Sequence, residues 1–251
     1  MEDEIVRVSS ASYAKYKELL IERDEVTKDA FQAEHEYFRV FGELIVDIFR
    51  QKVESIRLKK SIEYCRRFKN RGEKVNLKEM QIYLQKEIDE YQKKLDQMAQ
   101  DYEETKKSEK VSKMEMMEIK RIYRRMVKKI HPDINPLTIR DENLFALWNR
   151  LVIAYNCNDL KELKELEVLI EMALEGLDGE GGEVDIPDIE EKIAEIEAEI
   201  EMIKSKEPYL YRGLLQDPIL MEEKKEELRQ ELKEYKDYCE ELQKTLDELI
   251  V

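Results

Sequence analysis

Apolar residues recur every three or four positions along most of this chain, a spacing that places them on one face of an α-helix. The period is clearest in three stretches, 84–102, 189–203 and 228–249. Their seam positions are Leu84, Ile88, Tyr91, Leu95, Met98 and Tyr102; Ile189, Ile193, Ile196, Ile200 and Ile203; and Leu228, Leu232, Tyr235, Cys239, Leu242, Leu246 and Leu249. Steps that alternate between four and three residues predict coiled-coil seams.

The first 110 residues predict a helical hairpin arm. One long helix, or two collinear helices, is expected over 11–70, and its middle, Phe38–Phe49, is apolar enough to pack against more than one neighbour. A turn should follow, with Gly72 near a helix C-terminus and Asn76 as an N-cap. Because this turn is short, the second helix, 77–105, is expected to lie antiparallel to the first.

A second helical unit is predicted over 111–176. Ser112 followed by Glu115 matches a capping box, which marks the start of a helix. Pro132 disfavours helical geometry at the residue before it, so this helix should end there, and further helices should follow. The expected seam of the unit is Met116, Ile119, Tyr123, Met126, Ile130, Leu144, Trp148, Leu151 and Tyr155. Trp148 and Tyr155 are therefore interpreted as core residues rather than ligand-binding residues.

Two further segments complete the predicted organisation. The segment 177–187 holds three of the seven glycines and predicts a linker. Residues 188–251 predict an acidic coiled-coil hairpin that turns at 207–218. The expected fold is all-α and elongated, with an N-terminal hairpin (1–110), the central unit, the linker and the C-terminal antiparallel hairpin. A heptad seam could close within one chain or between two, so a homo-oligomer is one option.

Composition agrees with an all-helical chain and removes several function classes. Charged residues make up 41%, and there are only 7 glycines and 5 prolines. The net charge of −15 argues against general nucleic-acid binding and against an anionic membrane surface. The three cysteines, Cys65, Cys157 and Cys239, are isolated, which argues against a zinc site or a disulfide framework. With no apolar leader and no run of 18 apolar residues, we expect a cytoplasmic, reducing location and no membrane span.

Charge is distributed unevenly along the chain. Residues 176–251 carry 24 acids and 10 bases, whereas the rest carry 35 and 34. By contrast, 119–130 contains six bases and no acid. These bases, here called the basic face, are Lys120, Arg121, Arg124, Arg125, Lys128 and Lys129. On a helix they lie opposite the apolar seam, where they could orient an acidic partner. Ion pairing between the acidic C-terminal hairpin and the basic face is a further hypothesis.

The basic face is followed at once by His131-Pro132-Asp133, then by Asn135 and by the run WNRLVIAY at 148–155. Together with Tyr123-Arg124-Arg125, these motifs make the stretch from about Lys113 to Leu174 resemble a J-domain, the module that recruits and activates DnaK-type chaperone ATPases. The resemblance covers about a quarter of the chain. No YxxLG-type first helix precedes the basic helix, and 77–105 is the candidate to replace it. Gly/Phe-rich and CxxCxGxG regions are absent.

The resemblance implies a set of partner-binding residues. These are His131, Pro132, Asp133, Asn135, Lys120, Arg121, Arg124, Arg125, Lys128 and Lys129. The loop would engage the chaperone near its interdomain linker and promote ATP hydrolysis, while the basic face would contact an acidic surface on the nucleotide-binding domain. Pro132 restricts the backbone, so the loop loses less entropy on docking. The reaction itself would belong to the partner.

The expected function is that of a non-enzymatic co-chaperone without a cofactor, whose arms bind an unknown protein client. The alternative is a coiled-coil scaffold in which the J-domain-like unit has only a structural role. An enzyme is disfavoured because the sequence offers no nucleophile–base pair, metal-ligand set or phosphate-binding loop. His35, the other histidine, is interpreted as a partly exposed helical residue.

Overall fold

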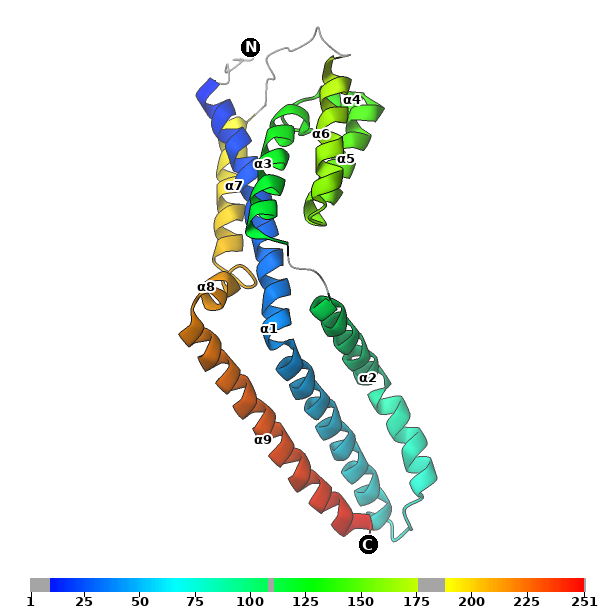
Figure 1. Ribbon diagram of the computed structural model, residues 1–251. Helices are drawn as coiled ribbons and strands as arrows, with labels where there is room; N and C mark the ends of the chain where they lie inside the picture. The colour runs from blue at the N-terminus through cyan, green and yellow to red at the C-terminus, as the bar shows by residue number, and fades with distance from the viewer. Residues whose placement is uncertain (1–9, 108–110, 176–187, 251) are drawn as a thin grey trace, which may run out of the picture. The chain divides into compact units, whose positions relative to one another are not determined.

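A computed structural model describes residues 10–107, 111–175 and 188–250, and within these ranges the protein contains helices and no strands (Figure 1). The all-α prediction is thus confirmed. The helices are α1 (Ser10–Asn70), α2 (Leu77–Lys107), α3 (Lys113–Ile130), α4 (Leu137–Arg140), α5 (Glu142–Asn156), α6 (Leu160–Glu175), α7 (Ile189–Lys204), α8 (Tyr211–Gln216) and α9 (Pro218–Ile250). None of the helices in these ranges combines the length and hydrophobicity needed to span a membrane.

The chain forms two compact units that share α1. Unit 1 comprises residues 1–32 and 109–210, and unit 2 comprises 33–108 and 211–251. This division differs from the predicted one, because α7 belongs to unit 1 and α9 to unit 2. The predicted linker, 177–187, lies outside the described residues. A heptad seam shows that a helix has a partner but does not identify that partner, so the sequence could not show which unit α7 and α9 each belong to.

Unit 1 is built around one apolar core. Residues of α1 such as Leu20 and Ile21 are buried together with the inner faces of α3, α5, α6 and α7. The four isoleucines of α7 at positions 189, 193, 196 and 200 belong to this core. Salt bridges from Lys15 to Glu197 (2.7 Å) and from Lys204 to Glu22 (2.7 Å) show that α7 runs parallel to α1, as Figure 1 also shows.

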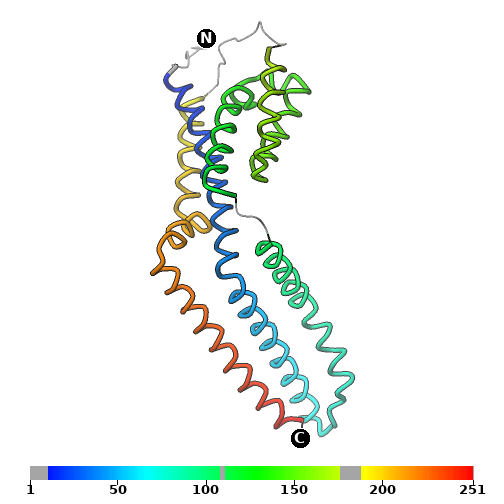
Figure 2. Tube along the Cα trace, viewed as in Figure 1, coloured from blue at the N-terminus to red at the C-terminus, as the bar shows by residue number. Residues whose placement is uncertain are grey.

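Unit 2 consists of α1 from residue 33 onward, with α2 and α9 along its sides, and the short helix α8 (Figure 2). The turn after α1 has Gly72 in the left-handed region (φ 70°), and the Asn76 side chain accepts a hydrogen bond from the Lys78 amide (3.1 Å), as predicted. The helices meet in three small apolar clusters rather than in one core. The heptad positions Leu84, Leu95, Leu228, Cys239 and Leu246 are buried in these clusters.

Gly42 lies where α1 and α2 approach each other closely within unit 2. A Cβ atom at this position would lie 2.4 Å from Cδ2 of Tyr102, far inside van der Waals contact. The Tyr102 ring in turn packs edge-on against Phe38, with 5.8 Å between ring centroids. A glycine in the middle of α1 usually weakens a helix, and here it makes room for a ring of α2.

Candidate partner-binding site

Helix α3 begins and ends where its sequence predicts. The Ser112 hydroxyl accepts a hydrogen bond from the Glu115 amide (3.2 Å), and the Glu115 carboxylate accepts one from the Ser112 amide (2.9 Å), which completes the capping box. The helix ends at Ile130, and His131 has extended backbone geometry. Asp141 caps α5 by accepting a hydrogen bond from the Leu144 amide (2.8 Å).

The loop from His131 to Asn135 is held by its own hydrogen bonds. The His131 Nδ1 atom accepts one from the Asp133 amide (3.1 Å), so its proton is assigned to Nε2. The Asn135 side chain donates to the Lys129 carbonyl (2.9 Å) and accepts from the Leu137 amide (3.1 Å). The second of these bonds starts the short helix α4, which the sequence did not predict. The loop is therefore ordered before any partner arrives.

The His131 side chain lies inside unit 1. Only 6% of the residue is exposed, and its imidazole packs edge-on against Trp148 with 4.8 Å between ring centroids. Burial lowers the pKa of His131, while the carboxylates of Asp133 and Asp24 oppose that shift. Asp133 itself is exposed, and Pro132 is half-buried. Of these three loop residues, Asp133 is therefore the most accessible to a partner and His131 the least.

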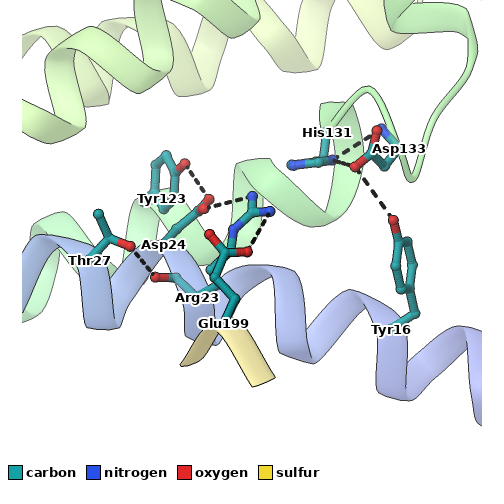
Figure 3. A network of polar contacts seen from close by, with 8 residues as sticks. All are labelled: Tyr16, Arg23, Asp24, Thr27, Tyr123, His131, Asp133 and Glu199. Atoms are coloured by element: carbon teal, nitrogen blue, oxygen red, sulfur yellow. Dashed lines mark hydrogen bonds and ion pairs between the residues drawn. The ribbon is translucent and has the colours of Figure 1, made fainter. Parts of the chain in front are cut away.

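Helix α1 contacts this loop directly. The Tyr13 hydroxyl donates to the Ile134 carbonyl (2.8 Å), and the Tyr16 hydroxyl makes a longer bond to the Asp133 carboxylate (3.5 Å). Figure 3 shows Tyr16 reaching Asp133 from α1. The segment 77–105, the candidate for a helix preceding the basic one, belongs to unit 2 as α2, whereas residues of α1 lie in the core of unit 1.

The basic face of α3 is lined on both sides by carboxylates. On one side α1 supplies them, in the pairs Lys120–Asp29, Arg124–Glu25 and Lys128–Glu18. On the other side α6 supplies them, in the pairs Arg125–Glu167 and Lys129–Glu171. Arg121 lies 3.7 Å from Glu118 of its own helix. Every predicted basic residue therefore has a carboxylate partner.

These pairs neutralise the basic face while leaving most of its bases exposed, although Lys120 has only 26% of its side chain exposed. The side chains of Arg121, Arg124 and Lys128 are 67%, 55% and 47% exposed. The hydrogen bond from Arg124 to Glu25 raises the pKa of the guanidinium, and that from Lys129 lowers the pKa of Glu171. Ion pairs at this exposure each contribute about 0.2–1 kcal/mol, so an outside carboxylate can compete with them.

Two stacked tyrosines form the inner side of the site. The rings of Tyr123 and Tyr155 lie 3.7 Å apart and nearly parallel, and both residues are buried. The Tyr123 hydroxyl donates to the Asp24 carboxylate of α1 (2.9 Å). Burial, followed by the charge of Asp24, raises the pKa of Tyr123. The interpretation of Tyr155 as a core residue is confirmed, and Trp148 is half-buried against the same core.

Lys28 is a site residue that sequence reasoning missed. Its ammonium group lies over the Tyr155 ring, 3.7 Å from the centroid, and also contacts the Tyr155 carbonyl. Burial is the main reason that the pKa of Lys28 falls to about 8, and nearby Lys120 adds to the shift. The sequence did contain a signal for its position, because Lys28 lies four residues after Asp24 and so falls on the same helix face as Tyr16, Leu20 and Asp24.

The acidic C-terminal residues do not pair with the basic face in the described ranges. Glu197 and Glu199 of α7 instead lie near Lys15 and Arg23 of α1, at 2.7 and 3.9 Å. Figure 3 shows Glu199 approaching Arg23. For α7 the hypothesis that the acidic hairpin covers α3 is not supported by these pairs, and for α9, which belongs to unit 2, it stays a prediction. Net charge located the acid-rich segment, but the carboxylates beside α3 belong to α1 and α6.

Among the described residues, no group of three or more His, Cys, Asp or Glu side chains is placed to hold a metal ion. No protein-family model matches the chain, and neither a curated protein nor a solved structure with significant similarity was found. The functional interpretation therefore depends on the residues themselves.

Proposed function

We propose that the protein is a non-enzymatic co-chaperone of the cytoplasm that recruits and stimulates a DnaK-type chaperone ATPase. The loop residues 131–135 and the basic face would bind the chaperone, and the helices of unit 2 would bind a protein client. The observation that carries the proposal is the motif at the end of α3. A basic helix stops at His131, an ordered loop presents Asp133 to solvent, and α5 returns through Trp148 and Tyr155.

The chemistry of the site supports partner recognition rather than catalysis. Arginine and lysine side chains at helical spacing can pair with carboxylates of another protein and set its orientation. A loop that is ordered in advance loses little entropy when it docks. No step in this mechanism needs a nucleophile in this chain, because the chaperone would hydrolyse its own ATP.

The test is single-turnover ATP hydrolysis by the DnaK-type chaperone of the same organism. The wild-type protein should accelerate hydrolysis, and His131→Gln should abolish the acceleration. His35→Gln, which changes the chain's other histidine, is the matched control and should behave as wild type. Equal rates with wild type, with His131→Gln and without the protein would refute the proposal, provided that circular dichroism shows both variants to be folded.

A second function is favoured by a specific observation. His131 is buried and every base of the basic face has an intramolecular carboxylate partner, as expected if the unit serves packing alone. In that case the protein would be a helical scaffold. A scaffold would bind its assembly with equal affinity as wild type and as His131→Gln, and neither form would change the rate of ATP hydrolysis.

A further inference from the structure

One face of residues 10–32 of α1 contacts the loop after α3, α3 itself and α5 in turn. The Tyr16 hydroxyl donates a hydrogen bond to Asp133 of the loop, and the Asp24 carboxylate accepts one from the Tyr123 hydroxyl. The Lys28 ammonium group lies over the Tyr155 ring. We infer that this segment is an autoinhibitory cover, which occupies the partner-binding face of α3 until an acidic partner surface displaces it. The inference rests on the proposed function, because it assigns a regulation to the same site.

The carboxylates of the cover bind the same bases of α3 that the carboxylates of a partner would bind. Along α1 they come in the order Glu18, Glu25 and Asp29, and their partners come in the reverse order on α3, at Lys128, Arg124 and Lys120. The two helices are thus antiparallel, with complementary charges in register. An incoming acidic surface would meet a basic face that already has its counterions.

The same segment also restrains the loop. Tyr13 and Tyr16 bind Ile134 and Asp133, so the loop is fixed from α1 as well as from within. On the inner side His131 packs against Trp148. A chaperone that needs the imidazole would have to move these groups, which makes release of α1 and exposure of the loop parts of one event.

The ion pairs that α6 makes with Arg125 and Lys129 are not part of this displaceable cover. The inner face of α6, at Leu163, Leu166 and Ile170, is fully buried in the core of unit 1, and α6 lies close to α3 in sequence. The α1 segment also buries Leu20 and Ile21. It differs from α6 in Lys28, whose buried ammonium group contacts the ring and the carbonyl of Tyr155 rather than a carboxylate. A buried charge weakens the packing of its own segment. The α1 side is therefore the one that a competitor can displace.

The inference is tested by removing the acids of the cover while leaving α3 unchanged. The variant Glu18→Gln/Glu25→Gln/Asp29→Asn should stimulate ATP hydrolysis about three- to tenfold more than wild type at low ionic strength, because three intramolecular ion pairs no longer compete with the partner. The gain should shrink at about 0.5 M salt, where surface charges are screened. Adding His131→Gln should cancel the stimulation.

A matched control removes three acids elsewhere. Glu191, Glu195 and Glu201 lie on the exposed face of α7, so Glu191→Gln/Glu195→Gln/Glu201→Gln changes the net charge equally. This variant should stimulate as wild type does. A rise as large as that of the α1 variant would assign the effect to net charge and would overturn the cover. Equal stimulation by wild type and the α1 variant would overturn it too, while leaving the proposed function intact.

A second readout does not depend on the chaperone. Acetylation of Lys120 and Lys128 is measured by mass spectrometry in the free protein, with exposed Lys113 as the internal reference. The α1 variant should raise the labelling of both lysines by about twofold or more, since their amines lose a carboxylate partner. If no variant stimulates hydrolysis, the proposed function fails. Unchanged labelling of Lys120 and Lys128 then overturns the cover as well.

Discussion

Units 1 and 2 share one helix, yet they are stabilised in different ways. Unit 1 has a single core that α1 shares with α3, α5, α6 and α7, and its polar groups form a network of tyrosines, carboxylates and bases around α3. Unit 2 has three separate apolar clusters along α1, with ion pairs such as Lys52–Glu231 outside them. The first part of α1 therefore combines apolar packing with specific polar contacts, whereas the second part packs mainly through apolar clusters.

The difference shows where recognition chemistry can reside. In unit 2 the heptad positions mainly determine that helices pack, through apolar side chains buried in small clusters. In unit 1, specific polar atoms of α1 meet specific atoms of α3 and of the loop. A core substitution in unit 2 should change stability without changing the loop or the basic face, whereas one in unit 1 should also change how the loop and the basic face behave.

The largest expected effect breaks the packing of unit 2 at Gly42. We expect Gly42→Ala to lower the free energy of unfolding by about 2 kcal/mol, because its Cβ would collide with Tyr102 and the helix gain of alanine is only about 1 kcal/mol. Gly213→Ala in α8, where a Cβ meets nothing within 4 Å, should be neutral or stabilising. Urea denaturation measures both. Equal effects of the two substitutions would show that the close approach is not real.

A somewhat smaller effect, of opposite sign, is expected in unit 1 at Lys28. The pKa of Lys28 is lowered to about 8, so the folded state loses its proton before the unfolded state does. The charged Lys28 therefore lowers the free energy of unfolding most below pH 8, and this cost decreases as the pH rises towards the ordinary pKa of lysine. Lys28→Met should stabilise the protein by about 1–2 kcal/mol at pH 7, less the lost contact with the Tyr155 ring.

The pH dependence separates this explanation from simple packing. Thermal melts between pH 7 and 9.5 should show the advantage of Lys28→Met over wild type shrinking as the pH rises. Lys17→Met is a less buried control on the same segment and should show a weaker trend. An advantage that stays constant with pH would contradict the assignment of the cost to a buried charge.

The smallest effect concerns the loop. Because burial lowers the pKa of His131, the folded state favours the neutral imidazole, and its stability should fall as the pH decreases below about 6.5, where the unfolded state takes up a proton. Asp133 and Asp24 reduce this effect and Arg23 increases it. Trp148, the only tryptophan, packs on His131 and reports the change by fluorescence. His131→Gln should remove the transition, and a transition that persists would have another origin.

Much of the fold could be predicted from local signals. The capping box at Ser112 and the proline after His131 set the ends of α3, and the turn at Gly72 separates α1 from α2. These signals act within a few residues, which a sequence displays directly. The seam of α3 was likewise visible as a four- and three-residue repeat, and Ile119, Tyr123, Met126 and Ile130 are buried.

What could not be predicted depends on which helices meet. The isoleucine seam of α7 has no feature that selects α1 over α9, and the acids of α1 at Glu18, Glu25 and Asp29 look like any solvated helix face. The role of Gly42 likewise becomes visible only when Tyr102 of another helix lies beside it. The candidate residues could therefore be listed from the sequence, whereas their carboxylate partners on α1 and α6 could not.

The most direct test of the central claim asks which unit the chaperone touches. A photo-reactive residue replaces Met117 on α3 or Ile82 on α2, both of which are exposed, and each protein is irradiated with a purified DnaK-type chaperone and ATP. We predict a cross-link from position 117 that disappears with His131→Gln, and none from position 82. Equal yields from the two positions, or a yield at 117 unaffected by His131→Gln, would contradict the account.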